Sequence, residues 1–348
     1  MTQAGTSHGL FPSARDEEWM LKALEVAETV RGSTSPNPWV GAVVVGPDGT
    51  ATSTGATSPP GGPHAEVAAL AAAGSAADGA TMYVTLEPCA HHGRTPPCVD
   101  AIVAAGVARV VVGVVDPDER VSGRGVAKLR EAGVDVTVGV ASQAVESSLG
   151  AYLKHRREGR PWVVLKLAAT LDGRIAAPDG SSKWITGPEA RADAHRLRAI
   201  SDAVVVGAAT VRADDPALTV RDAPGRDPMR VVLGDPGAVA PGAKVHPALF
   251  HEGDLGELLD LLGGRGVLQL LVEGGARVAG EFHRLGLVDQ YTIYFAPALM
   301  GGDDGLAMFA GPGASSMSAV TRGRIISVRS VGVDLRVDLV PGAGDSLR

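Results

Sequence analysis

The chain has 348 residues, of which 45% are hydrophobic, 20% are charged and only 4% are aromatic. A hydrophobic core rarely extends beyond about 250–300 residues, so this length predicts two domains, and the apolar fraction excludes a disordered chain. The net charge of −7 and the few aromatic side chains argue against an extended nucleic-acid surface but are compatible with a small anionic ligand. No apolar run reaches the roughly 18 residues of a membrane helix, and no secretory signal is visible, so we expect a cytoplasmic protein.

The first half of the sequence alternates between helical and extended patterns. Apolar residues from Trp19 to Val30 recur at helical spacing, after a capping pair at Ser13 and Asp16. Beyond this helix we predict strands at 40–45, 50–57, 82–86, 108–115 and 134–140, and helices at 65–73, 98–105 and 125–132. Such alternation predicts an α/β domain with crossover connections.

A short charged stretch from His155 to Pro161 interrupts this alternation. We therefore place a linker at 151–161, between a first domain at 14–150 and a second at 162–342. In the second domain we expect strands at 163–167, 203–206, 230–233, 267–272 and 290–296, and helices at 189–200, 255–262 and 277–285. Two alternating runs, 324–329 and 333–340, predict a final antiparallel pair, so the second domain is also α/β.

The most specific chemical signal is His64-Ala-Glu66, which follows a Gly/Pro loop at a helix start, together with Cys89 and Cys98 after the next strand. One imidazole and two thiols can supply three ligands to Zn²⁺ and leave the fourth tetrahedral position to water. Bound zinc lowers the pKa of that water towards about 7, and a carboxylate outside the ligand set can carry protons to the leaving group. We expect one zinc ion per chain on His64, Cys89 and Cys98, with Glu66 as the catalytic residue, a pattern typical of zinc deaminases.

Two alternatives share part of this pattern. A closed structural zinc site would take a fourth ligand from His91 or His92. A nucleic-acid deaminase, for example one acting on tRNA, would have the same zinc core and a non-catalytic C-terminal assembly domain. Acidity, scarce aromatic residues, the long interval between the cysteines and the fused second domain argue against the nucleic-acid alternative.

The interval Cys89-Ala-His-His-Gly-Arg-Thr-Pro-Pro-Cys98 is longer than in most zinc deaminases. Together with the segments 36–41, 83–88 and 123–125, it closely resembles the bifunctional deaminase/reductase family of bacterial riboflavin biosynthesis, over about residues 16 to 340. The resemblance implies an N-terminal cytidine-deaminase-like three-layer α/β/α domain and a C-terminal dihydrofolate-reductase-like α/β domain. It also implies zinc-dependent hydrolytic deamination of 2,5-diamino-6-(5-phosphoribosylamino)pyrimidin-4-one, followed by NADPH-dependent reduction of the ribosyl side chain to ribityl.

The same resemblance assigns the site residues. Substrate contacts in the deaminase half are Asn37, His91, His92 and Arg94, and those in the reductase half are Ser182, Arg198, Leu218, Arg221 and Glu273. NADPH contacts are Ala168, Trp184, Thr210, Asp214, Gly275, Ala276, Arg277, Val278, Ala279, Gly280 and Glu281. Lys166 and Asp172 are candidates for positioning or proton supply, although Asp172 fits an ordinary turn aspartate equally well.

From the residues alone, the second half is less specific. The paired glycines Gly274 and Gly275 lead from a strand into a helix, where backbone amides can bind phosphate, but such a pair is also common in tight turns. The segment 222–254 departs from the family and is short, so no cofactor contact near Asp235 is carried over. The partners implied are a small phosphoribosyl pyrimidine substrate and a second copy in a homo-oligomer, with no nucleic acid and no membrane.

Overall fold

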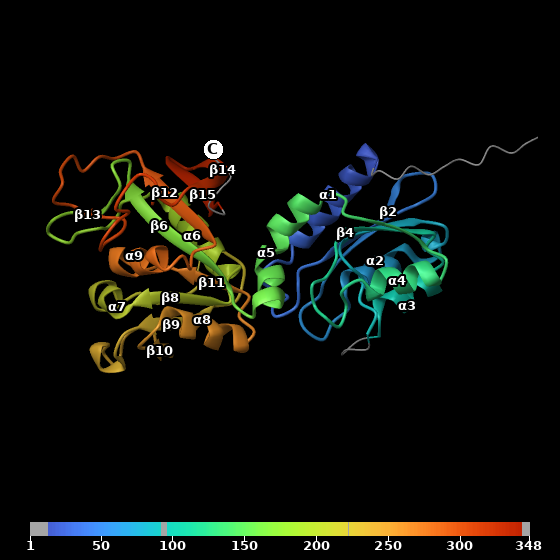
Figure 1. Cartoon of the computed structure of the whole chain (residues 1–348), viewed down its shortest axis with the longest axis horizontal. Helices are drawn as coiled ribbons and strands as arrows, with labels where there is room; N and C mark the ends of the chain where they lie inside the picture. The colour runs from blue at the N-terminus through green and yellow to red at the C-terminus, as the bar shows by residue number, and fades with distance from the viewer. Residues whose placement is uncertain (1–12, 92–95, 222, 343–348) are drawn as a thin grey trace, which may run out of the picture. The chain divides into compact units, whose positions relative to one another are not determined.

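The computed structural model describes residues 13–91, 96–221 and 223–342, and the chain divides into two compact units (Figure 1). Unit 1 is Met1–Glu158 and unit 2 is Gly159–Arg348. The segment expected to be a linker, 151–161, is largely helical, because helix α5 (Ser142–Glu158) continues to the last residue of unit 1. None of the helices in the described ranges has the length and hydropathy of a membrane span.

Unit 1 is built around a sheet in the strand order β2-β1-β3-β4-β5. Strand β1 runs antiparallel to β2 and β3, whereas β3, β4 and β5 are parallel to one another. The buried strands are rich in valine, as expected for a sheet that is covered on both faces. The strands are β1 (Gly41–Val45), β2 (Ala51–Ala56), β3 (Thr81–Leu86), β4 (Arg109–Val114) and β5 (Asp135–Val138).

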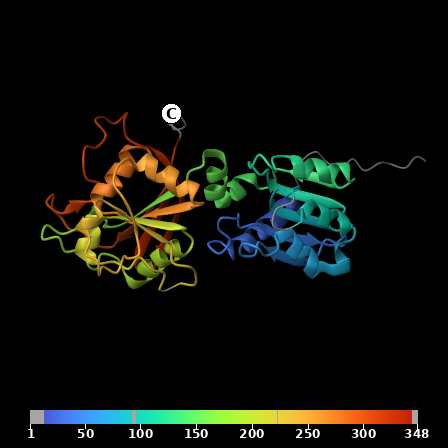
Figure 2. The same cartoon turned by 90° about the horizontal axis from the view of Figure 1, so that it is seen from below.

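Helices cover both faces of this sheet and form the expected three layers (Figures 1 and 2). Helix α1 begins with a capping box in which Ser13 and Asp16 bond reciprocally, as the sequence predicts. It packs with α5 on one face, and the other three α-helices pack against one another over the opposite face. The helices are α1 (Ala14–Glu28), α2 (Ala65–Ala73), the 3-10 helix η1 (Gly74–Ala77), α3 (Cys98–Ala104), α4 (Arg124–Glu131) and α5.

Unit 2 contains a larger sheet in the order β10-β9-β8-β11-β6-β12-β15-β14. The strands from β10 to β12 are parallel, and the predicted antiparallel pair β15 and β14 extends the sheet beyond β12. A short pair, β7 and β13, lies outside this sheet. The strands are β6 (Trp162–Thr170), β7 (Arg174–Ala176), β8 (Ala203–Gly207), β9 (Met229–Leu233), β10 (Leu249–His251), β11 (Gln269–Val272), β12 (Gln290–Ala296), β13 (Leu306–Ala307), β14 (Gly323–Val331) and β15 (Asp334–Pro341).

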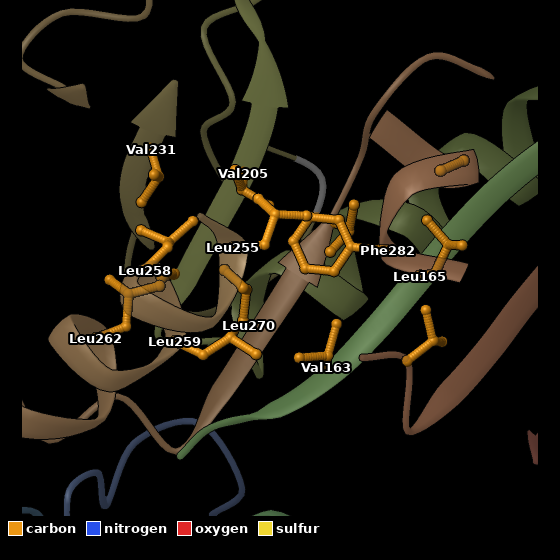
Figure 3. Packing of buried hydrophobic residues seen from close by; sticks show 14 of the residues in the cluster. Val163, Leu165, Val205, Val231, Leu255, Leu258, Leu259, Leu262, Leu270 and Phe282 are labelled. Carbon is orange, nitrogen blue, oxygen red and sulfur yellow. The ribbon is translucent and has the colours of Figure 1, made fainter. Parts of the chain in front are cut away.

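Alternate residues of these strands enter two apolar cores, one on each face of the sheet. The first core lies under α8 (Leu255–Gly264) and α9 (Ala276–Arg284), with Phe282 among leucine and valine side chains (Figure 3). The second lies under α6 (Pro188–Ala199) and α7 (Ala208–Asp214). Complete burial of a leucine or phenylalanine stabilises the fold by about 1.5–3 kcal/mol, so these two layers hold the sheet rigid beneath its connecting loops. A short 3-10 helix, η2 (Pro236–Ala238), lies in the long connection after β9.

A buried polar network joins α6 to the antiparallel end of the larger sheet. The Asp193 carboxylate accepts hydrogen bonds from Tyr294 at 2.7 Å, from Arg336 at 2.7 Å and from Arg329 at 2.9 Å. Burial raises the pKa of Asp193, but these hydrogen bonds outweigh burial and hold the pKa well below its usual range. The ionised carboxylate therefore stabilises this part of unit 2.

Candidate active sites

The structure brings together the imidazole and the two thiols that the sequence predicts as metal ligands. Their ligand atoms all lie within 4.8 Å of one another. The Nδ1 atom of His64 is 3.2 Å from Sγ of Cys98 and 3.6 Å from Sγ of Cys89. Tetrahedral zinc with ordinary Zn–S and Zn–N bonds holds such donors about 3.5 Å apart, so this trio fits the ion.

Three different local structures supply these ligands. His64 is the N-cap of α2, and its side chain makes no capping hydrogen bond, so the ring is available to a metal. Cys89 lies in the loop just beyond the carboxyl end of β3, and Cys98 is the first residue of α3. The backbone N–H of Cys98 donates to the Cys89 sulfur at 3.3 Å, which holds the two ends of the intervening loop together. Residues far apart in sequence thus meet at one end of the sheet, where α/β proteins commonly bind ligands.

Glu66 lies in the first turn of α2, two residues after the histidine, and is only 4% exposed. Burial raises the pKa of its carboxyl to about 7. A carboxyl with a pKa near neutrality can both accept and release a proton at neutral pH, as a general acid–base catalyst requires.

The two thiols are hydrogen-bonded to each other, and this contact shifts their pKa values in opposite directions. The hydrogen bond with Cys98 lowers the pKa of Cys89 to about 4, whereas the same contact raises the pKa of Cys98. The hydrogen bond with Cys89 raises the pKa of His64. A thiolate next to an imidazole and a second thiol is a donor set that prefers soft or borderline cations such as zinc.

The structure describes two of the four residues predicted to contact substrate in unit 1. Asn37 is half-buried, and its backbone N–H donates to the Thr34 carbonyl at 2.9 Å. His91 is also half-buried, and its Nδ1 atom is buried without a hydrogen-bond partner among the described residues. Such an unpartnered ring nitrogen is costly unless a ligand or water binds it. His92 and Arg94 lie outside the described residues.

In unit 2, three charged residues assigned from the sequence converge. Arg198 on α6 donates to Glu273, just after β11, through Nε at 2.5 Å and Nη2 at 2.7 Å. Lys166 on β6 interacts electrostatically with both Glu273 and Arg198. Burial lowers the pKa of its ammonium. Burial opposes ionisation of Glu273, but the Arg198 guanidinium outweighs it and leaves the pKa of Glu273 lowered.

Arg198 is largely committed to contacts within the protein. Besides the two bonds to Glu273, its Nη1 donates to the Thr219 carbonyl at 3.2 Å. The side chains of Arg198 and Glu273 are only 13% and 10% exposed. The sequence assigns both residues to the substrate but does not show that they form an ion pair. Their contact with the sugar-phosphate substrate stays a prediction.

The remaining residues that the sequence assigns to the substrate of unit 2 have varied environments. Ser182 is half-buried, Leu218 is buried with a left-handed φ of 53°, and Arg221 is exposed. The backbone N of Arg221 lies 3.3 Å from Nδ1 of His195, which is also 3.1 Å from the Thr219 carbonyl oxygen. His195 is a buried residue of α6 that the sequence did not single out.

Two strand-to-helix turns lie side by side where the sequence predicts a nucleotide. Strands β8 and β11 pair in parallel, so the starts of α7 and α9 adjoin. Gly275 is the N-cap of α9, and a Cβ built on it would be 3.6 Å from Oγ1 of Thr210 on α7. At Gly274, a Cβ would collide with Val278, so this turn requires glycine. Ala168 is half-buried on the neighbouring strand β6.

The other predicted cofactor residues are distributed around α9 and in the loops. Ala276 and Ala279 are buried, and Gly280 packs against the carbonyl of Ala310. Arg277 and Glu281 line an open groove of about 580 Å³ with Arg284 and Leu285. Two exposed residues lie in other elements: Trp184, in the loop before α6, is 70% exposed beneath the Arg191 guanidinium at 4.4 Å, and Asp214, the last residue of α7, pairs with Lys183 at 2.9 Å.

The carboxylate of Asp172 is held by hydrogen bonds from the protein itself. Its carboxylate accepts the backbone N–H groups of Met300 at 3.0 Å and of Gly301 at 2.8 Å, and the hydroxyl of Thr170 at 2.5 Å. The hydrogen bond from Gly301, followed by the others, lowers the pKa of Asp172 to about 2. A carboxylate with so low a pKa is a poor proton donor at neutral pH, which favours its alternative reading as a turn and loop anchor.

Comparison with known proteins covers both units. A model of the cytidine and deoxycytidylate deaminase zinc-binding region matches residues 13–114, and a model of the RibD C-terminal domain matches residues 161–337. The riboflavin biosynthesis protein RibD of Escherichia coli K12 is 41% identical, over 94% of this chain and 99% of the relative. That of Mycobacterium tuberculosis H37Rv is 43% identical, over 93% of this chain and 97% of the relative.

Solved structures give the same result. RibD of Acinetobacter baumannii, in one of two forms, superposes with a TM-score of 0.87 at 39% identity, over 94% of this chain and 99% of the other. A Thermotoga maritima protein, described as a diaminohydroxyphosphoribosylaminopyrimidine deaminase/5-amino-6-(5-phosphoribosylamino)uracil reductase, has a TM-score of 0.84 at 36% identity, with the same coverage. The predicted fold class, a deaminase-like domain followed by a reductase domain, is confirmed. The chain therefore belongs to the RibD family of riboflavin biosynthesis, whose members join a zinc-binding deaminase domain to a reductase domain in one enzyme.

Proposed function

We propose that unit 1 hydrolytically deaminates 2,5-diamino-6-(5-phosphoribosylamino)pyrimidin-4-one and that unit 2 reduces the ribosyl side chain of the product to ribityl with NADPH. The observation that carries the proposal is the meeting of His64, Cys89 and Cys98 beside the buried carboxyl of Glu66. This arrangement combines a metal donor set with a proton carrier that is not needed as a ligand.

In the deaminase site, bound zinc would supply Lewis-acid chemistry and lower the pKa of a coordinated water. His64, Cys89 and Cys98 would hold the ion. The carboxylate of Glu66 accepts the proton released as water oxygen bonds to the amino-bearing ring carbon. The protonated carboxyl then delivers that proton to the departing nitrogen, the carbon–nitrogen bond breaks, and ammonia leaves. A pKa of about 7 suits both transfers.

Orientation of the pyrimidine would come from the predicted substrate residues of unit 1. We assign His91 a direct substrate contact, because its buried Nδ1 has no partner in the described part of the chain. Asn37 offers an amide that can donate to and accept from a pyrimidine edge. His92 and Arg94 keep their predicted roles, with the Arg94 guanidinium suited to phosphate.

In the reductase site, the buried charged cluster would receive the sugar part of the substrate. Arg198 and Glu273 hold each other in place, and Lys166 contributes a cation whose pKa burial lowers. Ser182, Leu218 and Arg221 keep their predicted substrate contacts. NADPH would supply the hydride, and the adjoining starts of α7 and α9, near Thr210 and Gly275, offer backbone amides for its phosphates.

Two separate measurements on one incubation, ammonia release and NADPH consumption, test the proposal. With the diaminopyrimidinone alone, the protein should release ammonia, and the product mass should show an amino group exchanged for oxygen. Addition of NADPH should then consume the nucleotide, and the product should gain a hydride and a proton. Ammonia release without NADPH consumption would leave only the deaminase assignment, and deamination of tRNA instead of this substrate would favour the alternative. The homo-oligomer and the cytoplasmic location expected from the sequence stay predictions, the first of which light scattering tests directly.

A further inference from the structure

The Glu87 carboxylate is buried beside the zinc ligands, but neither metal binding nor proton transfer uses it. It is 4% exposed and lies between the end of β3 and Cys89. Its Oε1 accepts the backbone N–H groups of Gly125 at 2.9 Å and Val126 at 3.1 Å. Its Oε2 accepts those of Gly123 at 2.9 Å and Asp116 at 3.3 Å. One side chain thus satisfies four backbone donors, two in the loop between β4 and α4 and two in the first turn of α4.

The backbone of this loop is built for the contact. Gly123 is the N-cap of α4 in the left-handed conformation, with φ of 80°, and its N–H is one of the four donors. A Cβ at Gly125 would collide with the carbonyl oxygen of Pro88, the residue before Cys89. The sequence Gly123-Arg-Gly125 therefore lets α4 approach the ligand-bearing segment more closely than any other residue at position 125 would allow.

A second contact fixes the far end of that segment. The ammonium of Lys128, one turn further along α4, donates to the carbonyl of Ala90 at 2.9 Å. Ala90 lies between Cys89 and His91, whose ring nitrogen is buried without a partner among the described residues. Segment 88–91 is therefore held by α4 on both sides of the cysteine.

We propose that Glu87 and Lys128 are positioning residues of the deaminase site. They hold α4 against segment 88–91 and so fix the position of His91. The inference rests on the proposed deaminase function of unit 1. Removal of groups that orient residues around a metal site typically costs about 10–100-fold in activity or metal affinity. Because these two residues hold segment 88–91 and, among the described residues, hydrogen-bond to neither Glu66 nor a ligand side chain, the loss should appear mainly as a higher KM.

Glu87→Gln is the sharpest variant, because the side chain keeps its size while an NH₂ group replaces one acceptor and opposes two N–H donors. At full zinc occupancy, we expect kcat/KM for ammonia release to fall about tenfold or more, chiefly through KM. Lys128→Met removes only the ammonium from an exposed position and should give a smaller rise in KM. Asp16→Asn is the matched control, since Asp16 is equally buried at 4% exposure in the same unit but bonds Arg109 and Tyr83 instead.

Hydrogen exchange gives a readout that does not depend on activity. The amides of 116, 123, 125 and 126 should exchange faster in Glu87→Gln and remain protected in Asp16→Asn. If the wild type releases no ammonia, the proposed function fails, and the exchange result still decides whether Glu87 holds the loop. If Glu87→Gln does not fold, an unchanged KM in Lys128→Met overturns the inference. It is also overturned if folded, zinc-loaded Glu87→Gln has the KM of the wild type, or if Asp16→Asn raises KM equally.

Discussion

Replacement of Arg198 by methionine should destabilise unit 2 strongly, because it leaves a buried carboxylate without its partner. The two side chains are only 13% and 10% exposed, so solvent screens their interaction little. Removal of one member of such a pair costs about 3–5 kcal/mol. Lys166 also faces Glu273 and replaces part of the lost attraction, so we expect the lower end, about 3 kcal/mol. For a unit of this size, that corresponds to a fall in Tm of about 6–12 °C.

Urea unfolding of the full chain, with hydrogen exchange of peptides from β6, β11 and α6, would measure this loss and assign it to unit 2. Arg196→Met is the control on the same helix, since Arg196 is 59% exposed and its pairing with Asp193 should contribute less than about 1 kcal/mol. The double variant Arg198→Met/Glu273→Gln should recover part of the loss, because the remaining group is neutral. A loss no larger than the control's would refute this reasoning, whereas a raised KM for the reductase substrate would support the predicted contact of Arg198 with the substrate.

Three further outcomes follow from the same geometry. Glu66→Gln should retain zinc and lose about 10²–10⁴-fold in ammonia release, while NADPH oxidation with the deaminated intermediate persists; normal deamination would contradict the role of Glu66. Cys89 and Cys98 should react with a thiol reagent only after a chelator removes zinc, and recovery of a disulfide from active, metal-free protein would contradict their role as ligands. Asp193 has a lowered pKa in the folded state, so its contribution to stability is complete above its ordinary value of about 3.9 and is lost as the pH falls through the lowered value. The difference in unfolding free energy between wild type and Asp193→Asn should therefore be constant from about pH 8 to 5 and shrink below about pH 4; a difference that does not depend on pH would exclude this explanation.

The metal site could be predicted from the sequence because its chemistry restricts the residue types. The chain has only two cysteines, and both lie close to a histidine and a glutamate in chain order. Loop-to-helix and strand-to-loop positions then followed from turn residues and apolar periodicity, and His64 and Cys98 lie at those positions. Periodicity also predicted the alternation of both units, because buried strands and helices leave a strong apolar pattern.

Contacts between residues distant in sequence could not be predicted in this way. The pairing of Arg198 with Glu273 joins α6 to the end of β11, and only the sheet order brings them together. In the sequence, Glu87 resembles any residue at the end of a strand. Its hydrogen bonds to the loop after β4 and to the start of α4 depend on the folded structure. The last part of α5 resembles a linker in the sequence, because the charged run from His155 to Glu158 is typical of linkers and of polar helix ends alike.

The most direct test of the central claim, that one chain holds two chemically independent reactions, is to assay zinc-stripped protein for both. Chelator-treated and dialysed enzyme should release no ammonia from the diaminopyrimidinone, and added Zn²⁺ should restore the release. The same zinc-free sample should oxidise NADPH at the normal rate when it receives the deaminated intermediate, because the metal ligands and Glu66 all lie in unit 1. Ammonia release that survives zinc removal, or NADPH oxidation that falls in parallel with it, would contradict the account.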